Sequence, residues 1–131
     1  MRMGWGRPEQ DAAKVKMLLA KGADPNLQDK EGNTALILAA RADRIGNNED
    51  ATSMIASNGA DVNLANRRGE TALIAWAETF RYGQDLHRLR TLLEKGADPN
   101  AQDRDGNTAL KLLKPSQRDA IRLLRQAGAT R

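Results

Sequence analysis

Three kinds of residue in this sequence could do chemistry: one histidine, recurring carboxylates and recurring glycines. The chain has a single histidine, His87, and no cysteine, which excludes mechanisms that need two imidazoles, a thiolate or a cysteine-bound zinc. A lone histidine needs a positioned partner to act as a general base. His87 lies between the apolar residues Leu86 and Leu89, on the predicted solvent side of a helix. We therefore expect no catalytic role for it.

The carboxylates and glycines recur in a fixed register along the chain. A Gly-Ala-Asp-x-Asn motif occupies residues 22–26, 59–63 and 96–100, with 37 residues between copies. Carboxylates at such regular intervals indicate turn and cap residues, not acid–base pairs or calcium ligands. The glycines form no Gly-x-Gly-x-x-Gly or Gly-Lys-Ser/Thr phosphate loop. We expect no catalytic residue, no metal and no cofactor.

A second motif follows each first one and shows which elements these residues join. Ten residues after each first glycine comes Gly-x-Thr-Ala-Leu, at 32–36, 69–73 and 106–110. The first glycine suits the left-handed position that stops a helix. Asp or Asn three residues before the second glycine predicts a type I β-turn. The threonine before an apolar run predicts a helix N-cap. Each repeat is therefore a turn, a helix, a loop and a second helix.

These motifs resemble the ankyrin repeat, and the resemblance spans about Asp11 to Ala129. It implies an all-α solenoid in which stacked helix-turn-helix units are joined by β-turn or hairpin connections. We expect one domain over 1–131, divided into a partial first repeat at 1–28, repeats at 29–65 and 66–102, and a capping repeat at 103–131. Thr-Ala-Leu-Ile or Thr-Ala-Leu-Lys replaces the family's Thr-Pro-Leu-His, so we expect somewhat less rigid turns.

The repeats exceed the family's usual 33 residues by four. Gly46 and Gly83 mark the loop between the two helices of each repeat. One extra helical turn would keep the faces in register, so we expect first helices over about 34–44 and 71–81; the alternative is a longer loop. The second helices carry an apolar stripe at Leu86, Leu89, Leu92 and Leu93. The equivalent stripe of the central repeat, which includes Thr52, Ile55 and Ala56, is weaker, and we expect that helix to pack least well.

The two ends of the array differ. In the last repeat, residues 114–117 predict a tight connection, and Arg118, Arg122 and Arg125 form the polar outer face that a solenoid end needs. At the other end only a second helix is recognisable. Either Trp5 folds over the open end, or the array continues in a longer chain.

Charge leaves a second function class open. The net charge is +4, and residues 81–131 alone sum to +5. Nucleic acid or another polyanion is the alternative partner, although no basic run exceeds two residues and mixed surface charge is the simpler interpretation. No 18-residue apolar stretch predicts a membrane span. We expect a cytoplasmic chain, or a periplasmic or secreted one if a signal was removed, and a monomer with end-to-end dimerisation as the alternative.

The family resemblance implies a binding surface made of the turn tips and the exposed side of each first helix, on the concave face. Carried over to this chain, it predicts that another protein is bound there without catalysis, in an inhibitor, immunity or scaffold role. The residues so assigned are Lys30, Glu31, Asn33, Arg41, Ala42, Arg67, Arg68, Glu70, Glu78, Thr79, Arg104, Asp105 and Asn107.

Aromatic side chains add two candidates to that surface. The chain has few aromatics, and three of them lie within residues 76–82. Trp76 aligns with Ala39, a position of close packing, so packing is slightly favoured over binding for Trp76. Phe80 aligns with the charged Asp43, so binding is slightly favoured for Phe80.

Overall fold

The computed structural model describes residues 22, 24–41, 49–79 and 86–130. Within these ranges the chain forms helices and turns and no strand. The helices are α2 (Ala35–Arg41), α3 (Glu49–Ser57), α4 (Ala72–Thr79), α5 (His87–Glu94), α6 (Ala109–Leu112) and α7 (Arg118–Gln126). The predicted all-α architecture is confirmed.

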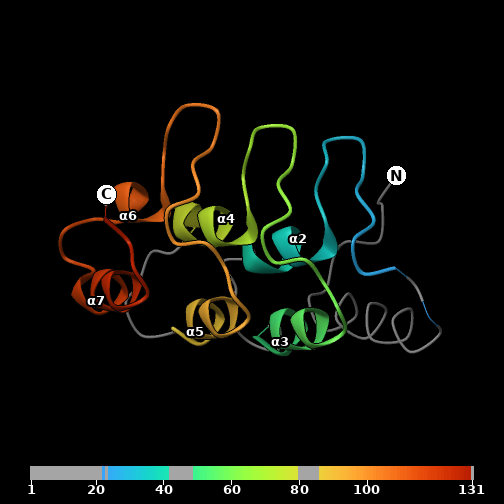
Figure 1. Ribbon diagram of the computed structural model, residues 1–131, viewed down its shortest axis with the longest axis horizontal. Coiled ribbons are helices and arrows are strands. Elements are labelled where there is room, and N and C mark those ends of the chain that lie inside the picture. The colour runs from blue at the N-terminus through green and yellow to red at the C-terminus, as the bar shows by residue number, and fades with distance from the viewer. Residues whose placement is uncertain (1–21, 23, 42–48, 80–85, 131) are drawn as a thin grey trace, which may run out of the picture.

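The helices stack in two rows. In Figure 1, α2, α4 and α6 form one row, α3, α5 and α7 form the other, and three long loops rise on the side of the first row. Helix α4 packs against α2, α6 and α5, while α3 packs against α2 and α5. Each helix pair therefore contacts the next pair along the chain, as the predicted solenoid requires.

Each first-row helix begins at a threonine. The hydroxyl of Thr34 accepts a hydrogen bond from the Ile37 amide at 3.1 Å, and that of Thr108 accepts one from the Lys111 amide at 3.2 Å. Thr71 makes the equivalent bond to Ile74 at 3.4 Å. These bonds satisfy amides that have no partner inside the helix, so the predicted N-caps are confirmed.

The three loops hold the predicted turns. The Gly32 amide donates to the Asp29 carbonyl at 2.9 Å, and the amides of Gly69 and Gly106 make the same bond within their own loops. These bonds close type I turns. At the other end of the loops, asparagines join neighbouring repeats. Asn63 Nδ2 donates to the Gly96 carbonyl at 3.1 Å, and its Oδ1 accepts from the Asp98 amide at 2.7 Å.

Neighbouring loops also touch through their backbones. The Arg67 amide donates to the Glu31 carbonyl, and the Arg104 amide to the Arg68 carbonyl, both at 3.0 Å. At Gly69, which has φ of +78°, an added Cβ would lie only 3.0 Å from the Arg104 amide nitrogen. Glycine is thus required there by the backbone angle and by the close approach of the next loop.

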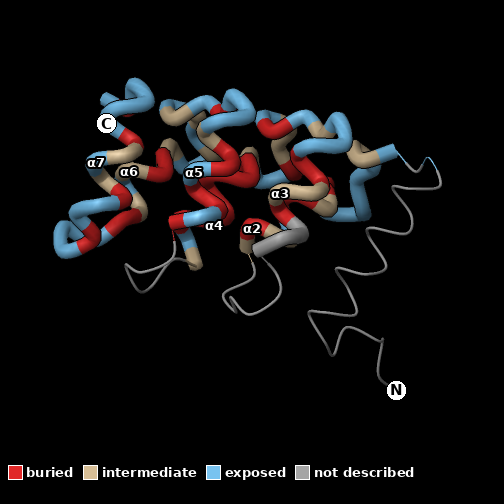
Figure 2. The backbone as a smooth tube through the Cα atoms, turned by 90° about the horizontal axis from the view of Figure 1, so that it is seen from below, coloured by how far each residue is buried: buried red, intermediate tan, exposed pale blue. Residues whose placement is uncertain are grey.

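The core lies between the two rows of helices. Figure 2 shows the buried positions concentrated on the helices and the exposed ones along the loops. Helix α4 is buried continuously from Ala72 to Ala77, and Leu89 and Leu92 of α5 are fully buried. On α3, the stripe residues Thr52, Ile55 and Ala56 are also buried. That α3 packs less well than the other helices remains a prediction.

The last repeat has the predicted short connection. The Gln117 amide donates to the Lys114 carbonyl at 2.9 Å, and Gln117 Oε1 accepts from the Lys114 amide at 2.7 Å. Helix α7 buries Ala120 and Leu124 and exposes Arg118, Arg122 and Arg125, so the predicted polar outer face is confirmed.

Several predictions concern residues outside the described ranges. They are the extra turn at the ends of the helices predicted over 34–44 and 71–81, the single helix of the first repeat, and the positions of Trp5, Ala42, Phe80 and Tyr82.

Candidate functional site

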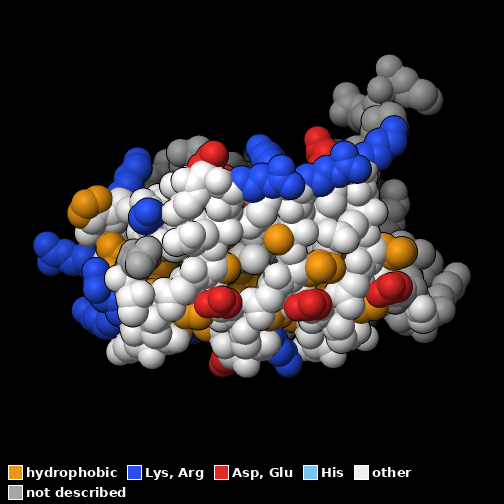
Figure 3. Space-filling view, turned by 45° about the horizontal axis from the view of Figure 1, so that its top comes forward, with side chains coloured by type: hydrophobic (Ala, Val, Ile, Leu, Met, Phe, Trp, Pro, Cys, Tyr) orange, Lys and Arg blue, Asp and Glu red, His pale blue; other side chains and the backbone are white. Residues whose placement is uncertain are grey.

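The tips of the three loops are polar and open to solvent. Figure 3 shows lysine and arginine side chains along the rim formed by the loops. Seven of the residues predicted to bind a partner lie here, and six of them are exposed. The exposed six are Lys30, Glu31, Arg67, Arg68, Arg104 and Asp105, and the half-buried one is Asn107.

Three residues assigned to partner binding are buried, which corrects that part of the prediction. Asn33 is 5% exposed, Glu70 3% and Trp76 1%. Trp76 fills the core between α4 and its neighbours, as the interpretation favoured for it suggested. Asn33 and Glu70 lie beneath the tips, where their polar groups are needed to satisfy neighbouring side chains.

Glu70 is the centre of a charged cluster under the loop tips. Its Oε1 lies 2.7 Å from Arg41 Nη2 at the end of α2 and 3.7 Å from Arg68 Nη2. The Glu70 side chain is 4% exposed, whereas that of Arg68 is 72% exposed. A carboxylate this buried needs paired charge to offset its lost hydration, and Arg41 supplies most of it.

Two asparagines complete the cluster. Asn66 Nδ2 donates to Glu70 Oε1 and to Asn33 Oδ1, both at 2.9 Å. Asn66 Oδ1 accepts from the amides of Arg68 and Glu70, again at 2.9 Å. The bond between Asn33 and Asn66 joins two repeats, so the cluster fixes the spacing of adjacent loops.

Glu78, on the exposed side of α4, interacts directly with this cluster. Burial, a hydrogen bond with Glu70 and repulsion by its carboxylate raise the pKa of Glu78 to about 7. For Glu70, burial acts to raise the pKa, but hydrogen bonds from Glu78 and Asn66 and the charges of Arg41 and Arg68 lower it. One proton therefore lies between the two carboxyls up to about pH 7. It is bound to Glu78 and hydrogen-bonds to the Glu70 carboxylate.

Arg88, which the sequence did not single out, contacts the C-terminal end of α2. Arg88 of α5 is only 6% exposed, and its Nη1 donates to the carbonyls of Ala39 and Ala40 at 3.3 and 3.2 Å. A cation at carbonyls near a helix C-terminus is favourable because it meets the negative end of the helix dipole. Arg88 thereby fixes the part of α2 that carries Arg41. Its equivalent in the preceding repeat is Ala51, so the repeat pattern gave no signal for it.

Two further predicted residues lie on the exposed end of α4. Glu78 is exposed, and Thr79 is half-buried, with its hydroxyl donating to carbonyls of α4 at 3.2 and 3.3 Å. The Thr79 hydroxyl is therefore engaged by the backbone of its own helix.

The chemistry of this arrangement is charge pairing. Two carboxyls with divergent pKa values can form a general acid and base, but ion-pair networks such as this one, with Arg41 and Arg68 close to both carboxyls, shift pKa values as well. Among the described residues, no group of three or more His, Cys, Asp or Glu side chains is placed to hold a metal ion. His87 is exposed, as predicted. None of the described helices is long and apolar enough to cross a membrane.

Comparison with known proteins agrees with this geometry. A family model described as ankyrin repeats, in three copies, matches residues 8–103, which is well over half of the chain. No curated protein matches the sequence.

Proposed function

Because the chain belongs to the ankyrin-repeat family, whose repeats generally mediate protein–protein interaction, we propose that it binds another protein non-covalently and does no chemistry of its own. The binding site in this proposal is the tip surface. It consists of the exposed or half-buried residues at the loop tips and on the first-row helices: Lys30, Glu31, Arg41, Arg67, Arg68, Glu78, Thr79, Arg104, Asp105 and Asn107.

The observation that carries the proposal is the pairing of a buried carboxylate, that of Glu70, with two arginines of the tip surface. Arg41 is held by Glu70, which Asn66 fixes in turn, and Arg68 lies 3.7 Å from the same carboxylate. Arg67 lies beside them on an exposed turn, and within the described ranges it has no ion pair. A partner thus meets guanidinium groups on a scaffold that is already ordered, which lowers the entropic cost of binding.

The chemistry of the tip surface favours an acidic or polar loop of the partner. Guanidinium groups bind carboxylates through two parallel hydrogen bonds and often anchor interfaces. Arg67, Arg68 and Arg104 supply these groups along neighbouring loops. Phe80, which follows α4 in the sequence and lies outside the described residues, is our candidate for an apolar anchor. An inhibitor, immunity or scaffold role fits this mode of binding, and we propose a cytoplasmic monomer.

Affinity capture tests the proposal. The wild-type chain would be immobilised and exposed to a lysate of the organism that encodes it, and the proteins retained would be identified by mass spectrometry. The test variant is Arg67→Glu/Arg68→Glu. The matched control, Arg90→Glu/Lys95→Glu, makes the same change of charge at exposed positions on and just after α5.

We expect the control to retain the same protein as the wild type and the tip variant to lose it, with both variants unfolding at about the wild-type temperature. Capture that survives in the tip variant would contradict the assignment of the binding site. Recovery of nucleic acid in place of protein would favour the polyanion alternative.

A further inference from the structure

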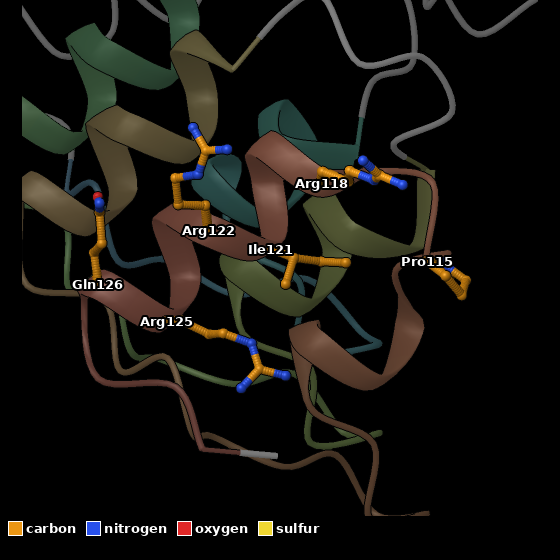
Figure 4. Close-up of a pocket in the computed structure, with 6 residues that line it drawn as sticks. All are labelled: Pro115, Arg118, Ile121, Arg122, Arg125 and Gln126. Carbon is orange, nitrogen blue, oxygen red and sulfur yellow. The ribbon is translucent and has the colours of Figure 1, made fainter.

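A second candidate surface lies at the C-terminal end of the solenoid. On the outer side of α7, six residues border an open hollow of about 520 Å³, which we call the end surface: Pro115, Arg118, Ile121, Arg122, Arg125 and Gln126. Figure 4 shows Ile121 between Arg118 and Arg125, with Pro115 beyond Arg118 and Gln126 beyond Arg125. A volume of this size accommodates several side chains rather than a single ion.

The end surface carries an excess of positive charge. Arg118, Arg122 and Arg125 are spaced at i, i+4 and i+7, so they lie along one side of α7 over about 10 Å of helix. Asp119 lies 3.9 Å from Arg122, and both side chains are 68% exposed, so this pair is weak. Within the described part of the chain, no carboxylate lies within 4 Å of the Arg118 or Arg125 guanidinium.

Between these cations the surface is apolar. Ile121 is half-buried and packs against the core on its inner side, while Pro115 borders the hollow at the start of the connection to α7. The Arg118 and Arg125 side chains lie on either side of Ile121 (Figure 4). A ligand that fits must offer negative charge at its edges and an apolar group at its centre.

The end surface is also held firmly in place. The Ala129 amide donates to the Leu124 carbonyl at 2.9 Å and closes the end of α7. Asn100 of the preceding loop donates from Nδ2 to the Gly128 carbonyl at 3.0 Å and accepts from the Thr130 amide at 3.0 Å. Helix α7 is therefore anchored to the preceding repeat, and its outer side is formed before any ligand binds.

We propose that the end surface is a second docking site, separate from the tip surface, for an acidic protein segment that carries an apolar side chain. Charge complementarity identifies the occupant: three arginines recruit carboxylates, and Ile121 contributes only if an apolar group covers it. A second copy docked through the same surface would bring like charges together. A nucleic-acid duplex would pair its phosphates with the arginines, but its bases stay stacked inside the duplex and would leave the apolar floor without a matching group.

Fluorescence anisotropy with defined probes tests this proposal. The main probe is a fluorescein-labelled peptide with a central leucine flanked by glutamates. A second peptide has serine in place of the leucine, and a third probe is a single-stranded oligonucleotide. The test variant is Arg118→Glu/Arg125→Glu. The control is Arg90→Glu/Lys95→Glu, which makes the same change of charge at exposed positions that belong to neither the tip surface nor the end surface.

We expect the test variant to bind the leucine peptide about tenfold more weakly than the wild type or worse, the control to bind it within about twofold of the wild type, and the serine peptide to bind more weakly than the leucine peptide. Should circular dichroism show that the test variant is unfolded, Arg118→Gln/Arg125→Gln replaces it with the same expectation.

Three results would overturn the proposal. They are failure of the wild type to bind the leucine peptide, equal loss of binding in the test and control variants, and tighter binding of the oligonucleotide than of the peptide. None of these results bears on capture through the tip surface, because that experiment leaves Arg118 and Arg125 unchanged.

Discussion

At the scale of single residues, the pair Glu70 and Glu78 is the most informative feature of the tip surface. Their carboxyls meet where α4 passes under the loop that carries Arg68. Glu70 is buried and pairs with Arg41. Glu78 is exposed, and its raised pKa keeps it protonated up to about pH 7. The charge that a partner meets at this point therefore changes with pH near neutrality.

The raised pKa of Glu78 predicts a specific pH dependence of stability. Its folded-state pKa of about 7 lies above the ordinary value of 4.5, so the folded chain holds this proton more tightly than the unfolded chain does. The resulting stabilisation is fully present below about pH 4.5 and is lost as the pH rises to about 7. Glu70 has the opposite sign: its lowered pKa stabilises the fold above its ordinary value, and that contribution is lost as the pH falls.

Glu78→Gln tests this dependence. The amide imitates the protonated carboxyl and still donates to Glu70, so we expect the melting temperature of this variant to fall less between pH 5 and pH 7.5 than that of the wild type. Glu94→Gln, at an exposed position on α5, should follow the wild type. Equal falls in the wild type and Glu78→Gln would show that the two carboxyls do not share a proton.

At the scale of elements, the close approach of adjacent loops sets the geometry of the tips. Gly69 and Gly106 occupy equivalent turns with φ of +78° and +81°, but an added Cβ meets the next loop only at Gly69. At Gly106 nothing lies within 4 Å, since Gly106 belongs to the last of the three described loops. Alanine substitutions at these two glycines therefore separate two contributions to the loss of stability: the positive φ angle, which both share, and crowding by the next loop, which occurs only at Gly69.

Gly69→Ala should therefore destabilise the chain more than Gly106→Ala. Both variants force alanine into a left-handed conformation, which costs roughly 1–2 kcal/mol. Crowding against the Arg104 amide should add about 1 kcal/mol or more at Gly69. Urea unfolding measures both values, and equal losses of stability would mean that the loops can separate freely.

The hydroxyl of Thr52 on α3 is buried and has no hydrogen-bond partner among the described residues. Thr52→Val keeps the shape and removes the unsatisfied group, so we expect the free energy of unfolding to rise by about 1 kcal/mol. Thr108→Val removes a hydroxyl that caps α6 and should lower it by about 1 kcal/mol. A destabilised Thr52→Val variant would indicate that this hydroxyl is hydrogen-bonded in solution.

The elements were predictable from sequence because each carries its own local signal. Thr34, Thr71 and Thr108 mark helix starts, and the glycines mark stops and turns, all at one register. The cross-repeat bonds of Asn63 gave no such signal, because an asparagine after Gly-Ala-Asp also suits an ordinary turn. The sequence also did not indicate which residues near the loop tips are buried. The burial of Glu70, for example, depends on a contact with Arg41, which lies 29 residues earlier in the chain.

At the scale of the whole molecule, the solenoid presents two basic surfaces on one stack of helices. The tip surface is built from the loops and the ends of α2 and α4, and the end surface from α7 and from Pro115 in the connection before it. The sequence located the excess charge in the C-terminal half and predicted that Arg118, Arg122 and Arg125 face outward, as the packing of α7 confirms. Because the two surfaces use different arginines, each can be changed without altering the other.

The measurement that tests the central claim most directly is a binding titration of the captured partner by isothermal calorimetry. We expect Arg67→Glu/Arg68→Glu to weaken the affinity at least about a hundredfold and the control Arg90→Glu/Lys95→Glu to leave it nearly unchanged, with all three proteins equally folded. Equal affinity of the wild type and the tip variant would contradict the claim that the partner binds at the tip surface.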